Sequence, residues 1–322
     1  MAVYNGEQYI KESINSVLTQ RNVDIELIIV NDGSTDKTLE IARSCAQLDD
    51  RVRVMDRTNS GRPSIPRNDG ISAAHGEYVC FLDHDDLYDP DRTYQLMQGL
   101  DQHPEWVAVF SEMRLIDSTG EIIPGMYLES YRFLDRASPY IRHLEDSWVE
   151  CNEKFFIFQS LYLASMHTST VMIARDRLPK DSIIFDTQFT LADDIDLWIR
   201  IGMLGKLGFL NRALSSYRQH ADSITRNFEK LETDTAAFHI HNYHRLCAVL
   251  TFSQALRLRT RIAGCVRSVA YLRYQQYRFI VARSEYRKSL QWRVNSEAVL
   301  GYLKTFLPVG LVRYLKKRTA IT

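Results

Sequence analysis

Three groups of polar residues in the first part of the chain each follow a short apolar segment. Asp32 follows residues 25–30, and Asp83-His84-Asp85-Asp86 follows residues 78–82. A third group follows residues 52–55 and contains Asn59, Arg62 and Arg67. Carboxylates bind hard divalent cations, and arginine side chains pair with phosphate oxygens. These residue types therefore predict a site that binds a metal ion and a phosphate group together.

The segments that carry these groups alternate between helix-like and strand-like patterns. Residues 9–18 repeat apolar side chains at helical spacing, whereas residues 25–30 are a β-branched run typical of a buried strand. Further strands are predicted at residues 52–55, 78–82 and 106–110, and Asp89 is predicted to cap the helix that follows it. Repeated βα units predict an α/β fold with a mostly parallel sheet flanked by helices, which binds ligands at the carboxyl ends of its strands. The three polar groups should therefore meet at one edge.

The middle of the chain offers two further features. Residues 116–165 are irregular and rich in aromatic side chains, among them Tyr127 and Tyr131. They predict either a packed insertion over the sheet edge or a wall that binds an acceptor substrate. Residues 169–174 resemble another strand, and residues 191–201 form a helical pattern that carries the adjacent acids Asp193 and Asp194.

Composition and charge limit the protein class. The 322 residues are 45% hydrophobic and 25% charged, with 40 Lys+Arg and 40 Asp+Glu, which excludes a disordered tail or a disulfide miniprotein. Residues 231–322 are helical in pattern and carry 16 Lys/Arg against 4 Asp/Glu. This basic region predicts a solvated helical face, a surface that attaches to an anionic membrane, or a surface for a partner protein. Nucleic-acid binding is disfavoured, because no recognised module is present.

The cysteine pattern predicts a reduced compartment. Five cysteines are present, an odd number, and none forms a CxxC pair. The first residues do not form a signal-peptide pattern, and the longest uncharged stretch, between Lys154 and Arg175, is too polar to span a membrane. We therefore expect a cytoplasmic protein, with peripheral attachment to the inner face of the cell membrane as the membrane alternative.

Several motifs of the chain resemble those of the family 2 glycosyltransferases, which have the GT-A fold. The matching segments, in order, are Val3-Tyr4-Asn5-Gly6, residues 28–36 (IIVNDGSTD), 66–71 (PRNDGI), 76–86 (GEYVCFLDHDD), 193–200 (DDIDLWIR) and 217–220 (YRQH). This ordered set covers roughly residues 2–225 and is far more specific than a lone DxD motif. It implies a GT-A glycosyltransferase domain over residues 1–228, followed by a basic helical region over residues 229–322.

The resemblance also implies roles for particular residues. Asp194 matches the general base of the family. Nucleotide-binding positions match Tyr4, Asp32, Arg67 and Asp83. The ligands of a Mg²⁺ or Mn²⁺ ion match Asp83, Asp85 and His220. For His220 a structural hydrogen bond remains an equal alternative, because imidazole is not a preferred magnesium ligand.

The implied reaction is a metal-dependent, inverting sugar transfer. A nucleotide sugar, with a UDP-sugar favoured by family frequency, would donate to the hydroxyl of a saccharide or lipid-linked acceptor during surface glycan assembly. A carboxylate base takes the proton of the attacking hydroxyl, and a divalent cation stabilises the charge of the leaving diphosphate. An NAD(P)-dependent oxidoreductase is disfavoured, because no G-x-G-x-x-G follows a strand.

One departure from the family pattern concerns the first strand. Family members usually place about five apolar residues before the Tyr-Asn pair, whereas here only Met1-Ala2-Val3 precede Tyr4. A shortened internal strand leaves the edges of its neighbours unpaired and exposes apolar surface. Either the natural start lies upstream, or the protein is an impaired enzyme or a non-catalytic protein that binds nucleotide sugars or glycans.

Overall fold

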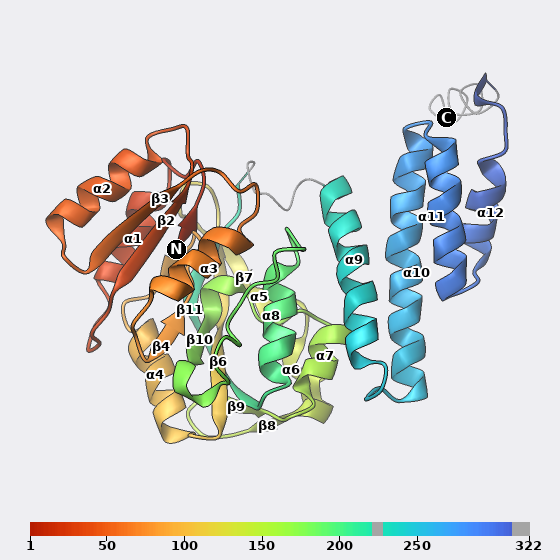
Figure 1. The fold of residues 1–322 in the computed structure, drawn as a ribbon. Coiled ribbons are helices and arrows are strands. Elements are labelled where there is room, and N and C mark those ends of the chain that lie inside the picture. The colour runs from red at the N-terminus through yellow and green to blue at the C-terminus, as the bar shows by residue number, and fades with distance from the viewer. Residues whose placement is uncertain (221–227, 311–322) are drawn as a thin grey trace. The chain divides into compact units, whose positions relative to one another are not determined.

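The β-branched segment predicted near residues 25–30 forms strand β2 (Leu27–Asp32), which is buried along its whole length. In this computed structural model, which describes residues 1–220 and 228–310, β2 pairs in parallel with β1 (Ala2–Val3) and β3 (Val52–Arg57). Helices α1 (Ile10–Leu18) and α2 (Thr38–Leu48) pack together, and their apolar faces share one core with these strands. Helix α3 (Ser64–Ala73) packs against β1 and β2 (Figure 1). This part of the α/β prediction is confirmed.

A larger sheet carries the rest of the first unit. Its strand order is β4-β10-β6-β11-β9-β8, with β5 paired to β11 and β7 paired to β6. The bounds are β4 (Tyr78–Cys80), β5 (Leu87–Tyr88), β6 (Trp106–Ile116), β7 (Ile122–Met126), β8 (Ile141–His143), β9 (Trp148–Cys151), β10 (Val171–Ala174) and β11 (Lys206–Arg218). Strands β6 and β11 pair in parallel. Strand β10 runs antiparallel to β4 and β6, and β9 runs antiparallel to β11, so the fold class is confirmed but the sheet is more mixed than predicted.

Helices cover this larger sheet. Helix α4 (Arg92–Gln102) packs against β6, β10 and β11, and α8 (Asp193–Gly202) packs against α7 (Phe155–Leu161) and β6. The short helices α5 (Tyr127–Ser130) and α6 (Phe133–Ala137) lie in the irregular segment. Three-residue 3₁₀ turns occur at Ser138–Tyr140, Thr168–Thr170 and Arg175–Arg177. The aromatic side chains of this segment join the main core, where Phe133, Phe155 and Phe158 pack on one another.

The predicted helix cap at Asp89 is wrong. Helix α4 begins two residues later than predicted, with Asp91 at its N-cap position and without a side-chain cap hydrogen bond there. Both carboxylate oxygens of Asp89 instead accept hydrogen bonds from the guanidinium of Arg114, each at 2.7 Å. A bidentate pair of this kind is stronger than one neutral cap, and it connects the end of β5 to β6.

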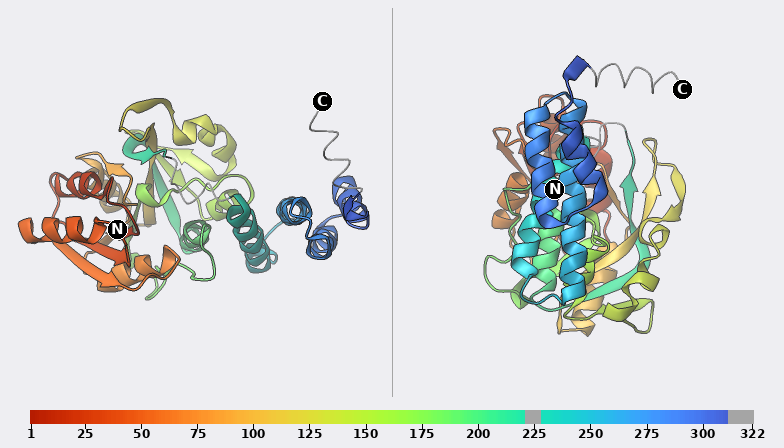
Figure 2. Two further views of the ribbon diagram at one scale, coloured as in Figure 1. Left: turned by 90° about the horizontal axis from the view of Figure 1, so that it is seen from above. Right: turned by 90° about the vertical axis from the view of Figure 1, so that its right-hand side faces the viewer.

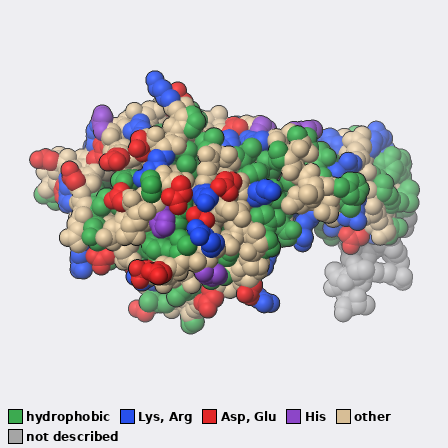
Figure 3. Space-filling model, turned by 90° about the horizontal axis from the view of Figure 1, so that it is seen from below, with side chains coloured by type: hydrophobic (Ala, Val, Ile, Leu, Met, Phe, Trp, Pro, Cys, Tyr) green, Lys and Arg blue, Asp and Glu red, His purple; other side chains and the backbone are tan. Residues whose placement is uncertain are grey.

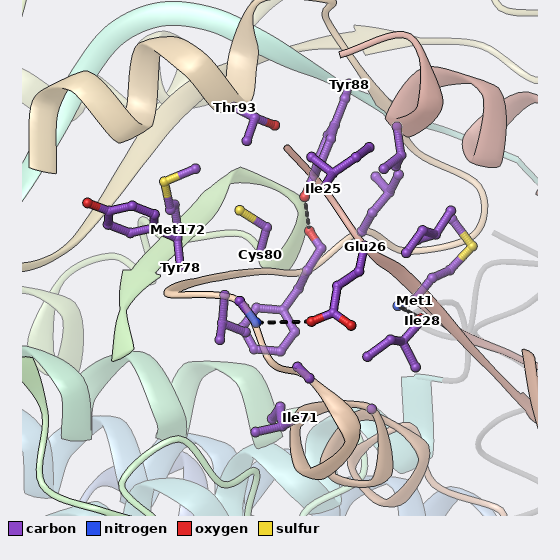
Figure 4. Close-up of a pocket in the computed structure, with 18 of the residues that line it drawn as sticks. Met1, Ile25, Glu26, Ile28, Ile71, Tyr78, Cys80, Tyr88, Thr93 and Met172 are labelled. Carbon is purple, nitrogen blue, oxygen red and sulfur yellow. Dashed lines mark hydrogen bonds between the residues drawn. The ribbon is translucent and has the colours of Figure 1, made fainter. Parts of the chain in front are cut away.

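A cavity of about 500 Å³ separates the two sheets (Figure 4). Strand β1 has two residues and pairs with β2, but among the described residues no strand pairs β1 or β2 with β4 on the other side of the cavity. Its lining is mostly apolar and includes Ile25 and Ile28 on one side, and Cys80 and Met172 on the other. The apolar space expected beside a short first strand is therefore present, whereas β2 keeps its pairing with β1.

The chain divides into two compact units, Met1–Ser223 and Ile224–Thr322. The described part of the second unit is formed by α9 (Phe228–Leu246), α10 (Phe252–Gln275), α11 (Phe279–Trp292) and α12 (Ser296–Lys304). Helix α10 packs against α9 and α11, and α11 packs against α12, as the two views of Figure 2 show. The helical pattern expected from about residue 228 is thus confirmed as far as residue 310, whereas residues 311–322 of the predicted basic region lie outside the described residues.

Candidate active site

The turn after β1 fixes the position of Tyr4. Asn5 adopts a left-handed backbone conformation, its backbone N–H donates to the Ser34 hydroxyl, and its side-chain oxygen accepts from the backbone N–H of Thr35. The next position has no room for a side chain, because a Cβ on Gly6 would lie 2.3 Å from the His84 ring. The Tyr4 side chain is left 49% exposed at the carboxyl end of β1, where it is available to a ligand.

Asp32, the last residue of β2, is held by the loop that follows β3. Its carboxylate accepts hydrogen bonds from the Arg57 guanidinium at 2.8 Å and from both the backbone N–H and the hydroxyl of Ser60. Gly33 permits this close approach, because it has a φ of 67° and a Cβ there would lie 2.6 Å from the Asn59 nitrogen. The side chain of Asp32 is therefore rigid and buried at the end of the strand.

Arg67 connects two carboxylates that lie 110 residues apart along the chain. Its guanidinium donates to Asp83 at 2.8 Å and to Asp193 at 3.0 Å, and it lies over the Phe185 ring at 5.2 Å. All three charged side chains are largely shielded from water, with Asp193 only 3% exposed. The start of α8 is therefore joined to the end of β4 by charge pairs in a site of low solvent access.

Asp194 points to a different partner from its neighbour Asp193. One carboxylate oxygen of Asp194 accepts a hydrogen bond from the Thr168 hydroxyl at 3.3 Å, and the other accepts from the Ile195 backbone N–H at 2.7 Å. Burial raises the pKa of Asp194, although the charges of Arg67 and His167 oppose this effect. A half-buried carboxylate with a raised pKa and no arginine partner of its own in the described structure is suited to accept a proton.

The carboxylates around Arg67 differ in their affinity for protons. Burial would raise the pKa of Asp83, but the charges of Arg67 and His167 outweigh it and lower that pKa. Burial raises the pKa of Asp193 to about 7, against the opposing charge of Arg67. Sites that drive neighbouring carboxylate pKa values apart are common in enzymes.

Asp85 forms a separate pair with His220, at the end of β11. The imidazole Nε2 lies 2.9 Å from an Asp85 oxygen, and the His220 ring packs on Tyr9 at 5.1 Å. The other ring nitrogen, Nδ1, is buried without a hydrogen-bond partner among the described residues. This geometry fits both alternatives left open by the sequence, a metal ligand and a structural hydrogen bond.

Two further residues lie at this site: Asp86, which the sequence placed in the polar group after β4 without a role, and His167, which sequence reasoning did not identify. The ligand atoms of Asp83, Asp86 and His167 lie within 4.8 Å of one another. Asp86 is fully buried, and its carboxylate accepts hydrogen bonds from the Ser169 hydroxyl at 2.6 Å and the Arg218 backbone N–H at 3.1 Å. The polar run His167-Thr168-Ser169-Thr170 directly before the buried strand β10 was the available signal.

The donor atoms present fit a divalent metal ion of the Mg²⁺ or Mn²⁺ type. Most of these donor atoms are carboxylate oxygens, which such ions prefer. They form two groups, Asp85 with His220 and Asp83 with Asp86 and His167, and the aspartates of both groups lie in one four-residue turn after β4. Of the predicted site residues, the structure thus joins Arg67 to Asp83 and Asp85 to His220 by direct contacts. It holds Asp32 and Tyr4 through separate loops at the carboxyl ends of β2 and β1.

Comparison with known proteins shows which family the chain resembles. The model for "Glycosyl transferase family 2" matches residues 1–157. The chain is 29% identical over 231 residues to "Putative glycosyltransferase EpsH" of Bacillus subtilis, a match that covers 71% of this chain and 62% of that protein. It is also 29% identical over 231 residues to "Glycosyltransferase GlyA" of Streptococcus pneumoniae, covering 70% of this chain but 30% of that protein. The chain thus spans less than two thirds of the length of these relatives.

Solved structures show the same fold. Residues 1–349 of S. aureus TarS match with a TM-score of 0.59 at 19% identity, over 95% of this chain and 87% of that one. The same fragment was solved in complex with UDP-GlcNAc, and that structure matches with a TM-score of 0.57, over 94% of this chain and 77% of that one. The mannosyltransferase PcManGT from Pyrobaculum calidifontis, in complex with GDP-Man and Mn²⁺, matches with a TM-score of 0.52 at 15% identity, over 99% of this chain and 78% of that chain. The resemblance to family 2 glycosyltransferases and the GT-A fold predicted from the sequence are confirmed.

Proposed function

We propose that this chain, as a family 2 glycosyltransferase, transfers a sugar from a nucleotide-sugar donor to an acceptor hydroxyl with inversion at the anomeric carbon. The observation that carries the proposal is the arrangement around Arg67, which places the start of α8 and its two acids beside the end of β4. In a single-displacement transfer the acceptor oxygen bonds to the anomeric carbon, the nucleoside diphosphate leaves with the electron pair, and a base takes the hydroxyl proton.

Asp194 is the base in this proposal. Asp193 is occupied by Arg67, whereas the Asp194 carboxylate has a weak 3.3 Å bond from Thr168 and a raised pKa due to burial. A raised pKa makes the carboxylate a stronger base toward the proton of the hydroxyl. Thr168 would orient the carboxylate toward the acceptor.

The donor would bind along the carboxyl ends of β1, β2 and β4. The exposed Tyr4 side chain would contact the nucleobase, and the rigidly held Asp32 would accept a hydrogen bond from an N–H of that nucleobase. Arg67 and Asp83 would bind the ribose and the diphosphate. A UDP-sugar is favoured. Asp83, Asp85 and His220 would hold a Mg²⁺ or Mn²⁺ ion, which when bound supplies positive charge to the leaving diphosphate.

The test compares two adjacent asparagine variants. Asp194→Asn should lower sugar transfer by roughly 10²-fold or more, the usual contribution of a general base, while UDP affinity by isothermal titration calorimetry stays unchanged. Asp193→Asn should instead alter UDP affinity, since it releases Arg67 from its partner. Turnover of Asp194→Asn equal to that of the unmodified chain would remove Asp194 from the role of base. Normal UDP binding by an unmodified chain that consumes none of a panel of nucleotide sugars would favour the non-catalytic alternative.

The domain assignment, residues 1–228 for catalysis and residues 229–322 for attachment, is part of the proposal. The described helices of the second unit leave large apolar side chains exposed, among them Phe252, Ile280 and Leu300, between basic residues. On the face in Figure 3, hydrophobic and basic side chains lie side by side over this unit. Within residues 1–220 and 228–310, none of the helices combines the length and the apolar character that crossing a membrane requires.

Peripheral attachment to an anionic membrane at the inner face of the cell would bring the site to a lipid-linked or saccharide acceptor. Ile280→Glu should then reduce co-sedimentation with vesicles that contain phosphatidylglycerol, because Ile280 is 83% exposed among arginines. Leu48→Glu is the matched control, since Leu48 is 88% exposed in the first unit. Equal binding of Ile280→Glu and the unmodified chain, or equal binding to neutral phosphatidylcholine vesicles, would exclude this attachment.

A further inference from the structure

Four aromatic side chains gather near Asp194 from three separate segments of the chain. Tyr127 begins α5, Tyr131 follows α5, His167 precedes β10, and Tyr217 lies near the end of β11. We call Tyr127, Tyr131, His167 and Tyr217 the aromatic platform. Ring centroids are 4.9 Å apart for His167 and Tyr217, 5.3 Å for Tyr127 and Tyr131, and 6.4 Å between Tyr127 and each of His167 and Tyr217.

The platform lies at the margin of the hydrophobic core, against which Tyr127 packs. Core rings such as Phe110, Phe133 and Phe155 are at most 2% exposed, whereas Tyr131 is 44% exposed and the other platform rings are half-buried. Aromatic side chains with a polar end that stay accessible are typical of surfaces that bind ligands.

The platform borders the carboxylate that we propose as the base. His167 is adjacent in sequence to Thr168, whose hydroxyl donates to Asp194 at 3.3 Å. Burial raises the pKa of Tyr127, and the negative charge of Asp194 contributes to this shift, which indicates that the phenol lies within reach of that charge. A molecule resting on the platform would therefore present its hydroxyl groups to Asp194.

This combination matches the chemistry of a pyranose ring. A pyranose has an apolar face of C–H groups and a rim of hydroxyl groups, so it needs aromatic faces on one side and acceptors such as a carboxylate at its edge. The side chains within the platform are uncharged apart from an imidazole, which disfavours a strongly anionic acceptor at this position. A bare lipid chain would not use the adjacent carboxylate.

We infer that Tyr127, Tyr131, His167 and Tyr217 form the acceptor subsite and bind an uncharged pyranose, with one hydroxyl directed at Asp194. This inference rests on the proposed function, since it uses Asp194 as the base. It resolves the two alternatives that the sequence left open for residues 116–165: the phenylalanines of this segment pack the core, and its exposed tyrosines bind the acceptor.

The test measures pyranoside binding without sugar transfer. Saturation-transfer difference NMR in the presence of UDP and diamagnetic Mg²⁺ would use methyl β-D-glucopyranoside, methyl β-D-galactopyranoside and methyl N-acetyl-β-D-glucosaminide as probes. At least one probe should receive saturation at its ring C–H protons, and Tyr131→Ala should weaken that binding roughly three- to tenfold, the range for loss of one aromatic contact. Tyr131→Phe should retain the binding, and Tyr271→Ala, a change at a 52% exposed tyrosine of α10, should leave it unchanged.

Two outcomes would overturn the inference. One is equal pyranoside affinity in Tyr131→Ala and the unmodified chain, and the other is contact with none of the three probes. Affinity for UDP should be the same in all of these variants, so a loss of UDP binding would show a general structural defect and contradict a platform that acts only on the acceptor. The proposed function fails separately, if a pyranoside binds to the platform but no nucleotide sugar is consumed.

Discussion

Replacement of Arg67 by methionine should destabilise the first unit in a strongly pH-dependent manner. Methionine preserves much of the volume and the contact with Phe185, but it leaves Asp83 and Asp193 without their cation. Breaking a buried ion pair by removal of one partner costs about 3–5 kcal/mol, because the other charge stays buried. Asp193, which is 3% exposed, dominates this cost, whereas Asp83 is 29% exposed and water can solvate it.

The sign of the pH effect follows from the raised pKa of Asp193. A carboxyl group whose pKa is higher in the folded chain than in the unfolded chain stabilises the fold when protonated, and this contribution is lost as the pH rises through the folded value. That value is about 7 with Arg67 present, and loss of Arg67 raises it further. At pH 6 Asp193 is protonated both in the unmodified chain and in Arg67→Met. We therefore expect their free energies of unfolding to differ by only about 1 kcal/mol, due mainly to Asp83. At pH 8.5 the difference should reach about 3 kcal/mol or more.

Urea unfolding followed by tryptophan fluorescence would measure this difference. A Trp292→Phe background leaves only tryptophans of the first unit as reporters. Arg132→Met is the control, because its ion pair with Asp135 is exposed to water and should contribute less than about 1 kcal/mol. Adding Asp193→Asn to Arg67→Met should remove most of the pH dependence. A cost for Arg67→Met that is the same at pH 6 and pH 8.5 would refute the assignment of Asp193 as the buried carboxylate that Arg67 neutralises.

Three further predictions concern activity and packing. Because burial raises the pKa of Asp194, kcat/KM should fall on the acidic side with a midpoint above the ordinary aspartate value of about 3.9, and a midpoint at or below that value would contradict Asp194 as the base. Chelation with EDTA should abolish release of UDP from the donor, excess Mn²⁺ should restore it, and Asp85→Asn should raise the Mn²⁺ concentration needed for half-maximal rate; full activity in EDTA would exclude the metal. Gly208→Ala should lower the free energy of unfolding by about 1–3 kcal/mol in urea titrations, since its Cβ would lie 2.2 Å from the buried Trp106 ring. Gly264→Ala, in an open position of α10, should instead be neutral or stabilise by up to about 1 kcal/mol, and equal effects of the two changes would contradict the packing described here.

The strands and their polar ends were predictable because each signal is local. A β-branched run such as residues 25–30 has few alternatives to a buried strand, and a polar residue that ends it, such as Asp32, must lie at the sheet edge. Parallel strands run in the same direction, so the last residue of each strand lies at the same edge of the sheet. The same argument places Asp83 and Asp85 after β4, as the structure does.

Partners across the chain were not predictable from these signals. Asp89 has the sequence features of a cap, but both of its carboxylate oxygens accept from Arg114. That partner becomes visible only when β5 and β6 are placed on the two sides of β11. His167 and Asp86 belong to segments 81 residues apart, and the antiparallel insertion of β10 between β4 and β6 brings them together. An expectation of a mostly parallel sheet could not have anticipated that insertion.

The two acids at the start of α8 show how geometry gives different roles to adjacent residues of one motif. Successive residues on a helix point about 100° apart, so Asp193 and Asp194 cannot face the same group. Asp193 points to Arg67 and is neutralised there, which stabilises the connection between α8 and β4. Asp194 points to Thr168 and, beyond it, to the aromatic platform. One carboxylate therefore supports the site and the other is available for proton transfer. A shift of the helical register by one residue would bring Asp194 to Arg67 and leave Ile195 in the position of the base.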